Sequence, residues 1–153
     1  MRDFEKISFE QFCKDINNNK NLYNSYKLPV RDSKLTAGYD IYLLEDLELK
    51  PNETVKLPTG IKSYFEADEV LLIVIRSSMG FKYNIRLVNQ VGVIDADYYN
   101  NKNNEGHIFL KIKNEGTETV KFKAGEAIAQ GIFFKYLITK SDSDLGLKRE
   151  SDY

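Results

Sequence analysis

The chain has few of the residues that build covalent frameworks or soft-metal sites. Its 153 residues include one cysteine, Cys13, and one histidine, His107. A lone cysteine excludes an internal disulfide framework, and one cysteine with one histidine cannot make a thiolate-and-imidazole zinc site. Any metal ion that this chain uses is therefore expected to be a hard cation, held by carboxylates, water or substrate phosphate.

Long apolar runs and a strong charge of either sign are also missing. Charged residues interrupt the first positions, so no signal peptide is expected, and no apolar run approaches the length of a membrane span. The formal net charge of -1 gives no general attraction to nucleic acid or to a membrane surface. These absences predict a cytoplasmic, intracellular protein with neither nucleic acid nor membrane among its partners.

The composition itself is that of a globular protein, with 42% hydrophobic and 12% aromatic residues over a length that fits one domain. Ser8-Phe9-Glu10-Gln11 has the form of a capping box, followed by apolar residues at helical spacing. This pattern predicts a short N-terminal helix with Cys13 on its apolar face. The Asn-rich run at 17–21 predicts a linker. We expect one domain at 1–153, with helix and linker at 1–28, a β core at 35–136 and a tail at 137–153.

From residue 29 onward the pattern changes to short apolar segments bounded by turn signals. Strands are predicted around residues 39–43, 47–49, 54–57, 61–65, 70–75, 85–88, 91–94, 107–113, 119–122 and 128–136. Because no helical segment separates them, we expect an all-β fold of the jelly-roll type, built as a β-sandwich or barrel, with the short N-terminal helix beside it.

A concentration of hydrogen-bond donors follows the apolar run at 70–75. The run ends abruptly in an arginine and two serines, and a polar turn comes next. Donors of this kind at a strand end can cradle phosphate oxygens. They are Arg76, Ser77, Ser78, the Gly80 backbone and Lys82. The plainer interpretation is that Arg-Ser-Ser is simply a polar turn.

A lone carboxylate, Asp95, closes the apolar segment at 91–94. In that place it is a candidate general base for activating a water, or else a residue that caps or turns the chain. Asp40 follows the small pair Ala37-Gly38, where backbone can approach another surface closely. Tyr98 can stack on a planar or sugar ring, and Gln130 offers an amide to an oxyanion. Each is weak alone, but their order along the chain is informative.

Four segments in this order resemble the first four motifs of the homotrimeric all-β dUTP diphosphatases (dUTPases). They are Ala-Gly-Tyr-Asp-Ile at 37–41, Arg-Ser-Ser with a lysine six residues after the arginine at 76–82, Asn-Gln-Val-Gly-Val-Ile-Asp-Ala-Asp-Tyr at 89–98, and Gly-Glu-Ala-Ile-Ala-Gln at 125–130. The resemblance implies a dUTPase-like β-clip subunit, a homotrimer with shared active sites, and Mg²⁺-dependent hydrolysis of dUTP to dUMP and pyrophosphate. That reaction limits uracil incorporation into DNA and supplies dUMP for thymidylate synthesis.

The same resemblance implies roles for the residues that handle the triphosphate. Asp95 would orient and deprotonate the water that attacks the α-phosphorus. Ser77, Ser78 and Gln130 would bond phosphate oxygens. Arg76 would fix the phosphate loop by pairing with a carboxylate of a neighbouring subunit.

For the nucleoside and the metal ion, the resemblance implies three further contacts. The uracil edge would be read by one hairpin, through Asn89 and the backbone of Gly92, Val93 and Ile94. Tyr98 would pack under deoxyribose and leave no room for a ribose hydroxyl. Asp40 would hold Mg²⁺ indirectly, through water.

The chain departs from the family pattern at Tyr99-Asn100, at Ala127 in the fourth motif and in two longer segments. An insertion-like run at 100–104 has the composition of an exposed loop, and we expect it to have no catalytic role. The chain then ends at 148–153 without the family's Gly-rich closing arm. Either it stops before such an arm, in which case Arg149 would begin the motif, or it lacks one. The first alternative is favoured because mobile Gly-rich termini are often unresolved.

Two other functions stay open. A second resemblance is to the related dCTP deaminases, which share the fold and the Arg-Ser-Ser loop. That resemblance implies a catalytic glutamate at about the position where this chain has Lys111, so deamination is not expected. A nucleotide sensor or protein-binding module on the same scaffold would explain a missing arm. Asp95 argues against the sensor, because a pure binding module has no need of a base.

Overall fold

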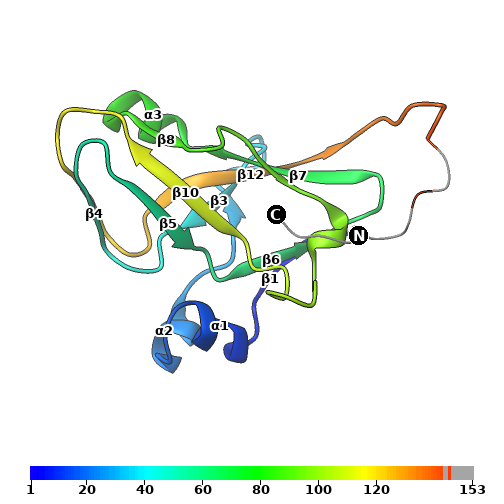
Figure 1. Cartoon of the computed structure of the whole chain (residues 1–153), viewed down its shortest axis with the longest axis horizontal. Helices are drawn as coiled ribbons and strands as arrows, with labels where there is room; N and C mark the ends of the chain where they lie inside the picture. The colour runs from blue at the N-terminus through cyan, green and yellow to red at the C-terminus, as the bar shows by residue number, and fades with distance from the viewer. Residues whose placement is uncertain (143–144, 146–153) are drawn as a thin grey trace.

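The computed structural model describes residues 1–142 and 145, and short strands make up most of it (Figure 1). The strands are β1 (Asp3–Lys6), β2 (Val30–Arg31), β3 (Tyr39–Tyr42), β4 (Leu47–Leu49), β5 (Thr54–Pro58), β6 (Ile61–Tyr64), β7 (Glu69–Ile75), β8 (Ile85–Leu87), β9 (Gly92–Ile94), β10 (Phe109–Asn114), β11 (Val120–Phe122) and β12 (Ala127–Lys135). The helices are α1 (Phe9–Asp15), α2 (Lys20–Ser25), α3 (Ser77–Tyr83) and the 3-10 turn η1 (Ala96–Tyr98). Every predicted strand is confirmed.

The strands form several small antiparallel sheets. One sheet has five strands in the order β2-β3-β12-β7-β9, another has the order β5-β10-β8, and two further pairs are β1-β6 and β4-β11. The all-β prediction is confirmed, although these sheets do not close into a barrel over the part of the chain that the structure describes. None of the helices described is long and apolar enough to cross a membrane.

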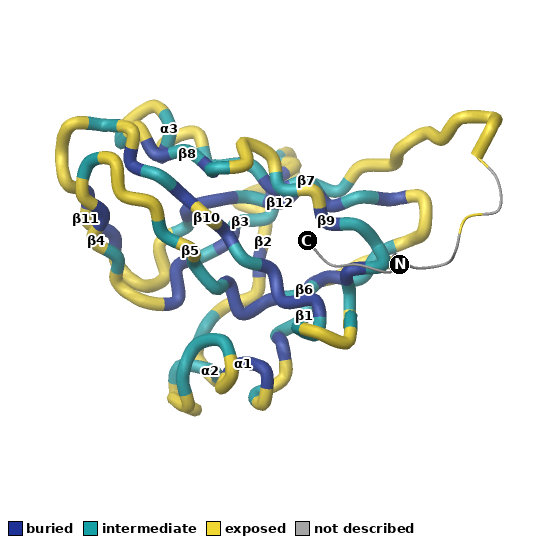
Figure 2. The backbone as a smooth tube through the Cα atoms, in the orientation of Figure 1, coloured by how far each residue is buried: buried dark blue, intermediate teal, exposed yellow. Residues whose placement is uncertain are grey.

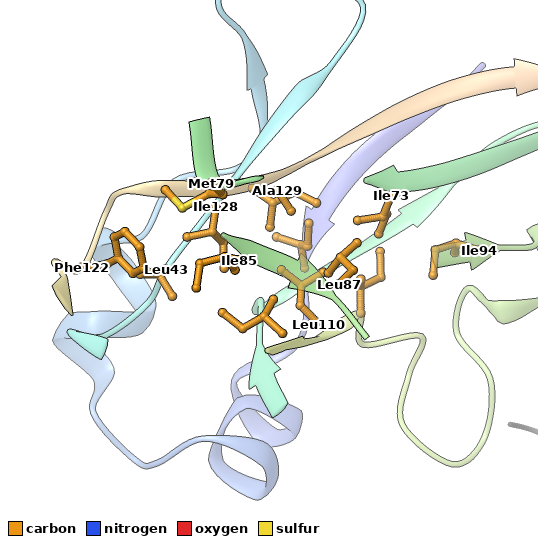
Figure 3. Packing of buried hydrophobic residues seen from close by; sticks show 14 of the residues in the cluster. Leu43, Ile73, Met79, Ile85, Leu87, Ile94, Leu110, Phe122, Ile128 and Ala129 are labelled. Carbon is orange, nitrogen blue, oxygen red and sulfur yellow. The ribbon is translucent and has the colours of Figure 1, made fainter. Parts of the chain in front are cut away.

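The core lies between the sheets, where alternate residues of each strand meet. Along β7 and β10 buried and more exposed residues alternate, as expected for strands with one face on a core. Figure 2 shows that burial concentrates on the paired strands, while many of the loops are exposed. In Figure 3, Ile73, Ile85, Leu87 and Leu110 converge from β7, β8 and β10, and each is at most 4% exposed. This packing fixes the strand ends that carry the candidate site.

The N-terminal segment contains more structure than predicted. The Asn-rich run is not a plain linker, because the Asn19 side chain accepts a hydrogen bond from Leu22 N at 3.0 Å and caps α2. β1, which was not predicted, pairs with β6. Cys13 is exposed, which corrects its expected place on the apolar face. Phe12 occupies that face instead and is fully buried.

The capping box of α1 is completed by a residue far along the chain. Ser8 Oγ accepts from Gln11 N at 3.1 Å, as the motif predicts. Gln11, however, turns its side chain to Asp15, and Glu105 takes over the reciprocal contact. The Glu105 carboxylate accepts from Ser8 N at 2.7 Å and from Ser8 Oγ at 2.5 Å. These bonds dock the start of α1 on the loop before β10.

The fully buried His107 joins α1 to the same loop. Its Nε2 accepts a hydrogen bond from Gly60 N at 2.9 Å, so the ring proton is on Nδ1, which donates to Asp15 Oδ2 at 2.6 Å. Burial is the main cause that lowers the pKa of His107 below its ordinary 6.5. Lys56 lowers this pKa further, whereas Asp15 and Glu105 act in the opposite direction.

Acidification should therefore destabilise the fold through His107. Since the folded state resists protonating this ring, the unfolded chain takes up the proton first, and stability is lost as the pH falls below about 6.5. Thermal unfolding midpoints between about pH 7.5 and about pH 5.5 test this, because His107 is the sole histidine. The midpoint should fall with pH in the unmodified chain and stay level in His107→Gln. A parallel decline in both proteins would contradict the assignment.

Candidate active site

A pocket of about 750 Å³ lies beside the turn between β8 and β9, and we call it the hairpin pocket. Asn89, Gly92, Val93 and Ile94 line it, together with Tyr98. A Cβ atom at Gly92 would lie 3.3 Å from Ile73 Cβ, so the glycine lets β9 run close against β7. The structure thus brings the predicted nucleoside-binding residues together around one cavity.

Tyr98 belongs both to the core and to the hairpin pocket. Its side chain packs in the main hydrophobic cluster, and the residue is only 6% exposed. The hydroxyl donates to the carbonyl of His107 at 2.6 Å and accepts from Asn104 Nδ2 at 2.8 Å. Tyr98 is therefore a core residue and also a part of the pocket wall.

Several residues that line the hairpin pocket were not predicted from the sequence. Lys56 and Lys111 stand directly opposite each other on β5 and β10, and both line the pocket. Lys56 Nζ lies 4.4 Å from the centre of the Phe109 ring. Asn103 and Asn104 also line the pocket, so the loop at 100–104 is more than the exposed loop that was expected. Strand alternation places Phe109 and Lys111 on one face of β10, but only the fold shows what that face borders.

A second group, which we call the Arg76 cluster, consists of Arg76, Asp40 and Gln130. Arg76 follows β7, and its Nε lies 3.3 Å from Asp40 Oδ1 on β3. Gln130 of the intervening strand β12 pairs in register with Asp40. The carboxylate that Arg76 contacts thus belongs to its own chain, whereas the resemblance implied one from a neighbouring subunit. A Cβ atom at Gly38 would fall 1.9 Å from Gln130 Oε1, which confirms the predicted close approach at this glycine.

The segment after Arg76 is the short helix α3, where the sequence predicted a polar turn. The exposed Ser77 and Ser78 begin the helix, and Met79 anchors it by burial. The Gly80 N–H donates to the carbonyl of Arg76 at 3.3 Å. This bond corrects the expectation for Gly80, since its amide is engaged within the helix and is not an open phosphate donor. Lys82 lies in the last turn and is exposed.

Asp95 lies between the hairpin pocket and η1. It follows Ile94 of the pocket wall, it is half-buried, and its carbonyl accepts a hydrogen bond from Tyr98 N at 3.0 Å. Among the described residues lining the hairpin pocket, no member of the Arg76 cluster is present. Among the described residues, the predicted site residues therefore fall into two groups, one lining the hairpin pocket and one around Arg76.

Metal-binding side chains are sparse near both groups. In the range that the structure describes, no three His, Cys, Asp or Glu residues come together in a way that could hold an ion. Asp40 is a single carboxylate beside a guanidinium. Such a residue suits Mg²⁺ that keeps its waters and takes other ligands from phosphate, but not an ion held by protein alone.

Comparison with known proteins gives consistent matches. Residues 24–151 match a family model described as dUTPase. The deoxyuridine 5'-triphosphate nucleotidohydrolase of Lactococcus lactis is 43% identical over 117 residues, which are 76% of this chain and 78% of that protein. The crystal structure of a dUTPase from Streptococcus mutans is 41% identical, with a TM-score of 0.73, and covers 90% of this chain and 98% of its own.

A more distant structure shares the fold. The dUTPase of phage phi11 of S. aureus, in a structure described as revealing the coordination of a structural Mg(II) ion, is 20% identical with a TM-score of 0.68. The match covers 99% of each chain.

Proposed function

The chain belongs to the dUTPase family, and on this premise we propose that the hairpin pocket binds the nucleoside of dUTP while the Arg76 cluster and α3 bind its triphosphate. The protein is a dUTP diphosphatase, a hydrolase of nucleotide metabolism that yields dUMP and pyrophosphate. The observation that carries the division of the site is the wall of the pocket, where Asn89, Gly92, Val93, Ile94 and Tyr98 meet.

Uracil would be recognised by the backbone of β9. This strand forms one edge of the five-stranded sheet, so its outward N–H and C=O groups can pair with a base as they would with another strand. Cytosine presents an amine where uracil presents an acceptor, and a buried mismatch of two donors is costly. A narrow hairpin would exclude the methyl group of thymine sterically.

The triphosphate would be held by donors that follow the end of β7 and by one donor within β12. Ser77 and Ser78 are exposed at the start of α3, and Gln130 on β12 pairs with Val74, two residues before Arg76. Lys82 adds a cation near the same surface, since it lines a small hollow together with Arg76 and Ser78. Phosphoryl transfer depends chiefly on positioning and charge stabilisation, which such donors supply.

Mg²⁺ and the attacking water complete the proposed site. The ion would be carried mainly by the triphosphate, with Asp40 contacting it through water, and it would supply charge neutralisation. Asp95, at the rim of the hairpin pocket, would orient the water and accept its proton. Gly80 has no part in this proposal, because its amide is already engaged.

A homotrimer with active sites shared between subunits would unite the two groups. The described lining of the hairpin pocket includes no member of the Arg76 cluster, and this supports the arrangement. A closed symmetric assembly repeats the same contact at each interface, so each interface would join one subunit's pocket to another subunit's phosphate donors. The segment with Arg149, where a closing arm was considered, lies outside the described residues.

Pyrophosphate release from dUTP, dCTP, dTTP and UTP in the presence of Mg²⁺ tests the proposed specificity. We expect rapid release from dUTP and rates at least about a hundredfold lower from the other three, because each mismatch leaves a buried polar group unpaired or forces a clash. Ammonia should not form from dCTP, since Lys111 rather than a glutamate lines the pocket. Equal rates with dUTP and dCTP would contradict the proposed reading of the base.

A further inference from the structure

The loop between η1 and β10 has a side chain at its centre that makes three hydrogen bonds. Asn104 Oδ1 accepts from Asn101 Nδ2 at 2.8 Å and from Gly106 N at 3.1 Å. Its Nδ2 donates to Tyr98 Oη at 2.8 Å. Because two N–H donors point at the oxygen, the orientation of the amide is determined, and its nitrogen must face Tyr98.

The Tyr98 ring is therefore held from two sides. Its hydroxyl accepts from Asn104 and donates to the His107 carbonyl at 2.6 Å. The ring itself packs among buried apolar side chains. Moving it would break hydrogen bonds and disturb a close-packed cluster, so the ring presents a firm surface to the hairpin pocket.

The loop that carries Asn104 is itself rigidly built. Glu105 and Gly106 have positive φ angles of 65° and 88°, and a Cβ atom at Gly106 would lie 2.8 Å from the Tyr98 carbonyl. The Glu105 carboxylate also accepts from Lys62 Nζ at 3.0 Å, in addition to its bonds with Ser8. The loop is thus fixed between α1 and β6, and Asn104 cannot retreat from Tyr98 without disturbing these contacts.

We propose that Asn104 is a positioning residue for Tyr98 and that it enforces the selection of 2′-deoxyribose over ribose. The inference rests on the proposed packing of Tyr98 against the sugar. A ribose hydroxyl would have to push the ring aside or be buried without a partner, and both are unfavourable. Asn104 raises the free-energy cost of pushing the ring aside, because the Tyr98 ring cannot move without losing the hydrogen bond from the Asn104 amide.

The test is kcat/KM for dUTP and for UTP in the full chain and in Asn104→Ala. We expect Asn104→Ala to lower the ratio of kcat/KM for dUTP to kcat/KM for UTP by about fivefold to tenfold, which is the effect of one lost hydrogen bond. The change in the ratio should come mainly from a lower KM for UTP. Lys102→Ala, an exposed change in the same loop, is the matched control and should leave the ratio unchanged.

Two tyrosine variants make the result decisive even if Asn104→Ala folds poorly. Tyr98→Phe leaves the loop side chains intact and removes both hydroxyl bonds, so it should narrow the preference at least as much. If Asn104→Ala and Tyr98→Phe lower activity equally on both substrates while Tyr98→Ala shifts the ratio, the inference is wrong and the sugar contact of Tyr98 stands. If Tyr98→Ala also leaves the ratio unchanged, both the role of Asn104 and the contact of Tyr98 with the sugar are wrong.

Discussion

Asp95→Asn is expected to slow dUTP hydrolysis by about 10²-fold to 10⁴-fold, the usual contribution of a general base. The amide has nearly the size and shape of the carboxylate, but it cannot accept a proton from water. Asp95 adjoins the pocket wall without being among the residues that line it, so nucleotide affinity should change little. Initial rates of pyrophosphate release give the first quantity, and calorimetric titration with dUMP gives the second.

The comparison for this variant is Asp68→Asn, an exposed exchange of the same kind on the loop between β6 and β7. Asp68 lies 3.7 Å from Lys135, and its replacement should leave turnover unchanged. Near-normal hydrolysis by Asp95→Asn would remove Asp95 from the proposed mechanism. Loss of dUMP binding together with activity would instead make it a residue that shapes the pocket.

The strands were predictable because each combines a short apolar run with a clear turn signal. The two elements that were not predicted, β1 and α3, have only weak local signals. β1 is a short segment with several charges, Asp3-Phe4-Glu5-Lys6, and it becomes a strand only by pairing with β6. α3 contains a glycine and too few turns to show helical periodicity, and it is held by the burial of Met79. In both segments tertiary contacts outweigh local propensity.

The candidate site likewise has one part that the sequence predicts and another part that depends on the fold. Asn89 to Tyr98 are close in sequence, so their meeting around one pocket could be predicted from a hairpin. The contact of Arg76 with Asp40 depends on the strand order β3-β12-β7, which no local pattern encodes. Asn104 was hidden in a run whose composition indicated only an exposed loop, and its bond to Tyr98 depends on the turn that brings Gly106 back to the same amide.

Mixing two inactive variants should restore activity if subunits share their sites. Arg76→Ala removes the cation from the Arg76 cluster and should reduce turnover by about 10²-fold, as the loss of a charge-stabilising group does. Asp95→Asn damages the other group. A site that takes its hairpin pocket from an Arg76→Ala subunit and its phosphate donors from an Asp95→Asn subunit contains neither change.

The size of the recovery follows from counting interfaces. In an equal mixture with free subunit exchange, about a quarter of the interfaces join the two intact halves, so about a quarter of normal activity should return. Unfolding and refolding the two proteins together, followed by the pyrophosphate assay, measures this recovery. The matched control mixes Asp95→Asn with Asp95→Ala. Both changes lie on the side of the hairpin pocket, so every interface stays damaged on that side.

The two mixtures together decide between a shared site and a site within one chain. Recovery in the first mixture and none in the control means that the pocket of one subunit works with the phosphate donors of another. No recovery in either mixture, from proteins that light scattering shows to be trimers, would require both groups to act within a single chain. The triphosphate would then have to run from the hairpin pocket to the Arg76 cluster of the same chain, although none of the described residues that line the pocket belongs to that cluster.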